Sequence, residues 1–178
     1  MSYIQERSFI ATLSSTTPGY EGILDSVESE TIPASRCNSW LTVSSPLTVG
    51  SPQRFWFGYY EGENPGYRIV TVESEDGASH RDFLALSSGN YIGYYVRVKK
   101  PLLWRIWVSG KKLEVPVVGV YSGVTIAAVG SVPIGVRNWR AWEDWYVSAG
   151  APNKLIMRMN VSEVNVPGFD SYKNFRRR

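Results

Sequence analysis

Apolar and polar residues alternate along much of this chain, and this two-residue period predicts β-strands, because neighbouring side chains on a strand point to opposite faces. The clearest example is residues 154–164, in which the positions of one face are Leu155, Met157, Met159 and Val161. The positions of the other face are Ile156, Arg158, Asn160 and Ser162. The pattern predicts a strand with one side in a core and the other nearer solvent.

Nine other stretches carry the same strand signal, namely residues 7–14, 40–44, 54–60, 66–73, 81–86, 91–98, 102–108, 113–120 and 124–129. Gly, Pro, Ser and Asn separate them in turn sequences such as SSTTPG, EGENPG, SSGN and SAGAPN. We therefore predict an all-β fold, an antiparallel, jelly-roll-like β-sandwich of about nine or ten strands with at most one or two short helices.

One short helix is predicted at residues 138–146, with Asn138 as its N-cap. Trp139, Trp142 and Trp145 repeat every third residue there, a spacing that places them on one side of a helix. We expect this turn to lie across an open edge of the sandwich and to bury the three rings.

The chain length bounds the domain organisation. With 178 residues, 43% of them hydrophobic, the chain can bury one sizeable core. We predict a single β-sandwich domain at residues 1–166 and a basic C-terminal tail at residues 167–178. The one cysteine, Cys37, cannot form a disulfide within the chain.

Charge is distributed unevenly along the sequence. Residues 1–82 hold five Lys and Arg against eleven Asp and Glu (net −6), and residues 83–178 hold fourteen against five (net +9). A basic surface that meets a partner is therefore expected to come from the C-terminal half.

Catalytic and cofactor motifs are not found. The single histidine, His80, lies in the polar turn SEDGASHRD, and neither a P-loop nor a dinucleotide-binding glycine motif occurs. The acidic residues around that turn fit no named calcium loop. We predict a protein that is not an enzyme and has no metal site and no cofactor.

Aromatic and basic residues concentrate in residues 91–112, where six cations occur and no carboxylate lies between Asp82 and Glu114. Alternation over residues 102–108 predicts that Trp104 is mainly in the core, with Arg105 and Trp107 on the other face. The candidate ligand-binding cations are Lys99, Lys100, Arg105, Lys111 and Lys112. Together with Trp107 they are suited to an anionic or zwitterionic lipid head group through charge and cation–π contact, and the same ingredients can stack sugars or single-stranded bases.

Several turn sequences, in order, resemble those of the actinoporins, which are basic, tryptophan-rich β-sandwich cytolysins of similar size. They are SSGN at 87–90, Ile92-Gly93, a Pro- and Trp-bearing stretch ending in VSGK at 108–111, YSG at 121–123 and SAG at 148–150 before a terminal strand. The resemblance covers roughly residues 83–162, with gaps.

This resemblance implies that Pro101, Trp104, Trp107 and Tyr121 surround a phosphocholine-type pocket at a membrane-facing end. Two departures limit what it implies. The family's Pro-aromatic-Asp loop is replaced by KKPL at 99–102, and the residues before the first predicted strand form no amphipathic helix. We therefore expect a protein that binds lipid head groups or a membrane surface without the family's N-terminal pore helix.

Two alternatives remain open. The first is a self-assembling structural protein, such as a viral or phage jelly-roll capsid subunit, in which Arg176, Arg177 and Arg178 contact neighbouring subunits or nucleic acid. The second is a carbohydrate-binding lectin that uses the same tryptophans. The sequence shows neither a signal peptide nor an apolar run of membrane-spanning length, so the compartment stays unknown: intracellular, released or part of a virion.

Overall fold

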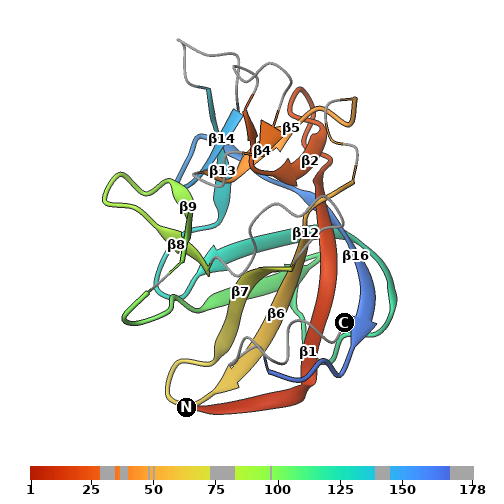
Figure 1. The fold of residues 1–178 in the computed structure, drawn as a ribbon, viewed down its shortest axis with the longest axis vertical. Helices are drawn as coiled ribbons and strands as arrows, with labels where there is room; N and C mark the ends of the chain where they lie inside the picture. Colours follow the sequence, from red (N-terminus) through yellow and green to blue (C-terminus); the bar gives the residue numbers. More distant parts are fainter. Residues whose placement is uncertain are drawn as a thin grey trace.

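The structure is a computed structural model that describes residues 1–28, 35–36, 40–47, 49, 51–72, 83–96, 98–138 and 145–168. Every regular element in these ranges is a β-strand, and every strand pairing is antiparallel (Figure 1). The predicted all-β antiparallel fold is confirmed.

Six strands form a closed ring. In order around the ring they are β1 (Ser2–Ser15), β16 (Met157–Val164), β12 (Gly119–Ala128), β10 (Trp104–Val108), β7 (Gly66–Val72) and β6 (Arg54–Glu61), and β6 pairs again with β1. The closure depends on β1, which is 14 residues long and pairs with β6 on one edge and with β16 on the other. This single closed sheet replaces the two separate sheets that the sandwich prediction implies.

The remaining strands extend the ring. One branch continues from β1 through β2 (Gly22–Asp25), β5 (Thr42–Ser44), β14 (Trp145–Ala149), β13 (Ile134–Asn138) and β15 (Asn153–Lys154). A second branch continues from β7 through β8 (Phe83–Leu86) and β9 (Ile92–Tyr95), and β11 (Lys111–Lys112) pairs with β10. The pair β3 (Val27–Glu28) and β4 (Ser35–Arg36) stands apart from this sheet, and the first branch gathers at one end of the ring (Figure 1).

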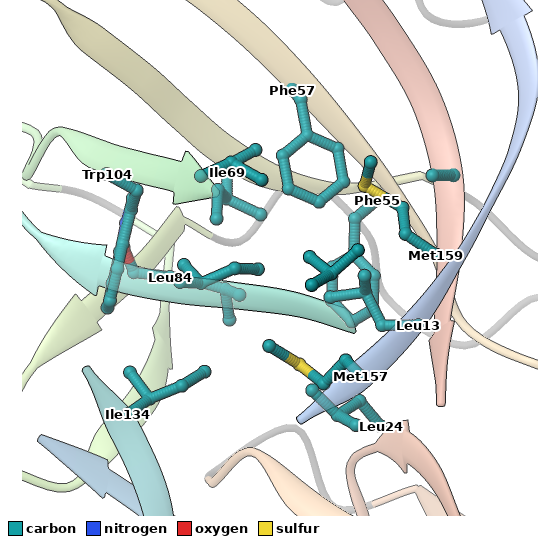
Figure 2. Close-up of a cluster of buried hydrophobic side chains, with 14 of the residues drawn as sticks. Leu13, Leu24, Phe55, Phe57, Ile69, Leu84, Trp104, Ile134, Met157 and Met159 are labelled. Atoms are coloured by element: carbon teal, nitrogen blue, oxygen red, sulfur yellow. The ribbon is translucent and has the colours of Figure 1, made fainter. Parts of the chain in front are cut away.

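The inside of the ring is filled by every second side chain of its strands. Figure 2 shows several of these side chains, Leu13, Phe55, Phe57, Ile69, Trp104, Met157 and Met159, pointing into one cluster. The alternation predicted for residues 154–164 is confirmed, because Leu155, Met157, Met159 and Val161 are buried while the residues between them are exposed.

Strand β6 is buried on both faces. Phe55 and Phe57 point into the ring, whereas Trp56 joins a second apolar cluster on the outside with Ile10 and Val70, its register partners on β1 and β7. This explains why β6 reads as a nearly continuous apolar run, RFWFGYYE.

The indole of Trp56 lies flat over Gly58, the next residue on the same face of β6. A Cβ added at Gly58 would lie 1.9 Å from Cη2 of Trp56. No side chain fits at this position unless the tryptophan moves.

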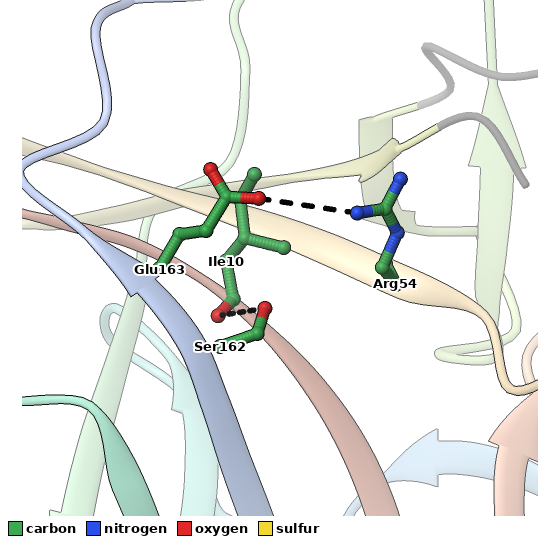
Figure 3. Close-up of polar contacts among 4 residues, drawn as sticks. All are labelled: Ile10, Arg54, Ser162 and Glu163. Carbon is green, nitrogen blue, oxygen red and sulfur yellow. Dashed lines mark hydrogen bonds and ion pairs between the residues drawn. The ribbon is translucent and has the colours of Figure 1, made fainter. Parts of the chain in front are cut away.

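An ion pair spans β1 on the outer surface. Nη1 of Arg54 on β6 lies 3.9 Å from Oε1 of Glu163 on β16, and both side chains are more than 40% exposed (Figure 3). Such an exposed pair contributes about 0–1 kcal/mol, so the ring is held by its core and its strand pairing.

The predicted helix at 138–146 is wrong at both of its ends. Asn138 ends β13, Trp145 begins β14, and the two residues are register partners in an antiparallel hairpin. Trp145 packs edge-on against Tyr20, at 5.3 Å between ring centroids. Trp139 and Trp142 lie outside the described residues.

Some strand limits also differ from the prediction. The first strand begins at Ser2, not Arg7, and residues 113–118, predicted as strand, pair with no strand. Val166, the last residue of the predicted domain, is buried, and the Tyr3 hydroxyl donates to its carbonyl oxygen.

Candidate functional site

Strand β10 changes partner along its length. Near its start, Trp104 pairs with Tyr67 at the beginning of β7. Beyond that point β11 takes the place of β7, with Trp107 opposite Lys112 and Val108 opposite Lys111. The β10–β11 hairpin therefore extends beyond the first residue of β7. We call this part of the molecule the hairpin end of the ring.

The outer face of the hairpin end brings Trp107 and Lys112 together. Directly opposite residues on antiparallel strands share a face, with Cβ atoms about 5 Å apart. Trp107 is half-buried, and Lys112 and its neighbour Lys111 are exposed. Arg105 lies one step back along the same face and is also half-buried. The hairpin end thus combines an aromatic ring with three of the predicted cations.

Lys99 and Lys100 lie elsewhere. They are exposed and precede Trp104, whereas Lys111 and Lys112 flank the far end of β10. The strand alone separates the two lysine pairs by about 13 Å, at roughly 3.3 Å per residue. The two lysine pairs therefore belong to opposite ends of β10.

Trp104 belongs to the core, as the alternation predicts. It is 1% exposed, and its indole N–H donates to the carbonyl of Leu84 at 3.2 Å. A ligand on the surface has no access to this ring, so the role that the actinoporin resemblance implies for Trp104 is not supported by its position.

Tyr121 and Pro101 also lie far from each other. Pro101 precedes β10, and Trp104, three residues later, pairs with Ala128 at the opposite end of β12 from Tyr121. The Tyr121 hydroxyl accepts from the Val117 N–H at 2.7 Å and donates to the Val117 carbonyl at 3.1 Å. The four residues implied by the resemblance therefore do not line one pocket in this structure.

Arg7 anchors the chain segment after the hairpin. Its Nε donates to the Glu114 carbonyl at 2.8 Å and its Nη2 to the Leu113 carbonyl at 3.3 Å. Its guanidinium lies 3.7 Å from the ring centroid of Tyr59. Burial raises the pKa of Tyr67 to about 12, and the positive charge of Arg7 offsets part of this rise.

A row of exposed valines at the hairpin end is a feature that the sequence interpretation missed. Val115, Val117, Val118 and Val120 are each more than 60% exposed. We call residues 113–120 the valine loop. Its signal was present in the sequence as LEVPVVGV, where Pro116 interrupts a run that we predicted as a strand.

A half-buried aromatic group was also missed. The ring of Tyr91 packs edge-on against Trp40 at 5.9 Å and Tyr146 at 6.4 Å between centroids, and Arg137 lies 5.8 Å from the Tyr91 centroid. These residues come from three separate parts of the sequence, so no local pattern predicts their meeting.

Other predicted residues fall outside the part of the chain that the structure describes: His80 and its acidic turn, Cys37, and Arg176, Arg177 and Arg178. Within the described ranges, no cluster of three or more His, Cys, Asp or Glu side chains is placed to hold a metal ion. The same ranges contain no helix with the length and hydrophobicity needed to cross a bilayer.

Comparison with known proteins returns no match to this chain among protein-family models, curated proteins or solved structures.

Proposed function

We propose that this chain is a non-enzymatic protein that binds lipid head groups at a membrane surface through the hairpin end of its ring. The observation that carries the proposal is the register of Trp107 with Lys112 on one outer face, with Arg105 on the same face and the exposed Lys111 next to Lys112 in the chain. A cation attracts lipid phosphate, and an indole at its side suits the interfacial region, where amphipathic rings are favoured.

The proposed lipid-binding surface contains fewer residues than the set predicted from the sequence. Trp104 lies in the core and Lys99 and Lys100 lie beyond the other end of β10, so the proposed contact consists of Arg105, Trp107, Lys111 and Lys112. Anionic head groups are the preferred ligand, because three of these four side chains are cations.

Vesicle co-sedimentation tests the proposal. We expect the chain to sediment with phosphatidylcholine/phosphatidylserine vesicles. Lys111→Gln/Lys112→Gln should weaken this binding by about tenfold or more, at about 1 kcal/mol for each basic residue. Arg105→Ala/Trp107→Ala should remove vesicle retention while the circular dichroism spectrum is unchanged.

A matched control uses the other lysine pair. Lys99→Gln/Lys100→Gln removes the same charge at the opposite end of β10 and should leave binding within about threefold of wild type. Equal losses for the two pairs would show that only net charge matters and would contradict the proposed surface.

Two alternative functions stay as predictions. Self-assembly as a capsid or other virion subunit predicts particle size that grows with protein concentration, which analytical ultracentrifugation measures. A lectin predicts sugar binding that survives removal of Lys111 and Lys112, which a glycan array with the Lys111→Gln/Lys112→Gln variant measures.

A further inference from the structure

The valine loop presents apolar side chains to solvent at one place on the surface. Val115, Val117, Val118 and Val120 are 65%, 62%, 61% and 63% exposed. All four lie within six residues: three lie between β11 and β12, and Val120 is the second residue of β12. Exposed apolar residues scattered singly need no explanation, whereas several exposed apolar side chains on one short loop are a candidate binding surface.

Contacts on both sides fix the conformation of the loop. Leu113 and Pro116 are buried and anchor it to the body of the protein. Arg7 binds the Leu113 and Glu114 carbonyls, and the Tyr121 hydroxyl exchanges two hydrogen bonds with the backbone of Val117. A loop that is already ordered loses little conformational entropy when its side chains are buried by a partner.

The charges around the loop favour an anionic surface. Lys111 and Lys112 directly precede it, and Arg158 is exposed on β16, two residues from Asn160, the register partner of Val120. Glu114 is the one carboxylate within the loop. Glu163 is exposed two residues from Val161, the register partner of Gly119, so the three cations Lys111, Lys112 and Arg158 outnumber the two carboxylates Glu114 and Glu163.

The size of the apolar group argues against a second protein copy as its occupant. Four partly exposed valines present on the order of 200 Å² of apolar surface, judged from the transfer energy of one valine. A stable protein interface buries about 800 Å² on each partner. A bilayer needs no matching shape, and shallow insertion of a few apolar side chains beside basic residues is sufficient for reversible binding.

We propose that the valine loop is the segment that enters the bilayer interface, with Val117 and Val118 in contact with acyl chains and Lys111 and Lys112 at the level of the phosphates. This inference rests on the proposed membrane-surface function and identifies how the surface is bound: by insertion as well as by charge.

The salt dependence of vesicle binding distinguishes binding by insertion from binding by charge attraction. We expect wild-type protein on phosphatidylcholine/phosphatidylserine vesicles to retain a salt-resistant part of its binding at about 0.5 M NaCl, where exposed charges are largely screened. Val117→Ser/Val118→Ser should weaken binding by about tenfold and abolish the salt-resistant part, and the basic residues should still support binding at low salt. The matched control is Val96→Ser/Val132→Ser, which alters two other exposed valines and should bind as wild type.

The outcomes are distinguishable. Binding by wild type that is lowered by Lys111→Gln/Lys112→Gln but not by Val117→Ser/Val118→Ser would overturn the insertion and leave the proposed function standing. Absence of any vesicle binding by the wild type would overturn both. A wild-type dimer that becomes monomeric in Val117→Ser/Val118→Ser, measured by ultracentrifugation, would assign the loop to self-association and overturn the insertion as well.

Discussion

The backbone N–H of Tyr59 donates to the hydroxyl of Ser8, 3.0 Å away, at a point where β1 and β6 lose their regular register. The same hydroxyl donates to the Ile4 carbonyl at 3.0 Å. The pairing resumes at Phe9, so one fully buried side chain replaces the missing backbone partner across the irregularity.

Replacing Ser8 by alanine should destabilise the protein by about 1–3 kcal/mol, because the buried Tyr59 N–H then has no acceptor. Urea unfolding measures the free energy of unfolding. Ser162→Ala is the control: Ser162 also donates to a carbonyl, that of Ile10, but it is exposed and should cost less than about 0.5 kcal/mol (Figure 3). Equal costs for the two substitutions would show that the Ser8 hydroxyl does not replace a backbone partner.

Gly58→Ala should cost about 2–3 kcal/mol, because the added methyl group and the Trp56 indole cannot occupy the same space. Thermal unfolding measures the loss. Gly89→Ala is the matched control, since a Cβ there lies 3.4 Å from the nearest Tyr91 ring atom and its neighbourhood is exposed.

A double-mutant cycle checks the cause. Trp56→Leu/Gly58→Ala should be less destabilised than the sum of the two single variants, because the smaller side chain leaves room for the methyl group. Strict additivity would place the cost of Gly58→Ala in the backbone and not in the Trp56 contact.

Stability should fall between about pH 10 and pH 12 through the ionisation of Tyr67. The folded pKa of about 12 exceeds the ordinary value of 10.0, so the folded state holds the proton more tightly than the unfolded state does. This contribution, about 3 kcal/mol for two pKa units, is fully present below pH 10 and is lost as the pH rises towards 12.

Urea unfolding at pH 9 and pH 11.5 measures this fall for wild type and for Tyr67→Phe. Every other side chain is common to the two proteins, so the difference between the two falls isolates the contribution of Tyr67. An equal fall in the free energy of unfolding for wild type and Tyr67→Phe would mean that the Tyr67 phenol is not the group responsible.

Arg7→Met should loosen the valine loop without unfolding the ring, because it removes the donors to Leu113 and Glu114. We expect the Val117 amide, which donates to Tyr121, to exchange its hydrogen about tenfold faster, corresponding to the loss of about one hydrogen bond. Hydrogen exchange followed by NMR measures this rate. Arg54→Met, which removes a surface cation from β6, should leave the Val117 rate unchanged.

The alternation of residues 154–164 predicted the buried side of β16 correctly, because a strand with one wet face encodes its orientation in its own sequence. The same reasoning placed Trp104 in the core. The closure of the ring was not predictable, since it depends on β1 pairing with strands about 50 and 150 residues away.

The helix prediction is wrong at residues 138, 145 and 146, because the spacing of Trp139, Trp142 and Trp145 fits one side of a helix, whereas Trp145 lies on a strand and packs on Tyr20. For the candidate site, the sequence offers Trp107 and the lysines as candidates but does not predict which of them are neighbours. Which of these residues are neighbours depends on β11 replacing β7 beside β10. This change of partner is set by the strand pairing of the whole sheet and not by a local pattern.

The pairing of β1 with β16 has a consequence for biosynthesis. Phe9 on β1 lies opposite Val164 on β16, so the ring is complete only after β16 has paired with β1. During translation the edge of β1 therefore stays open until residues 157–164 have left the ribosome, and the closure of the ring is expected to be a slow step of folding. Chaperones that shield open strand edges are therefore expected to raise the yield of folded protein.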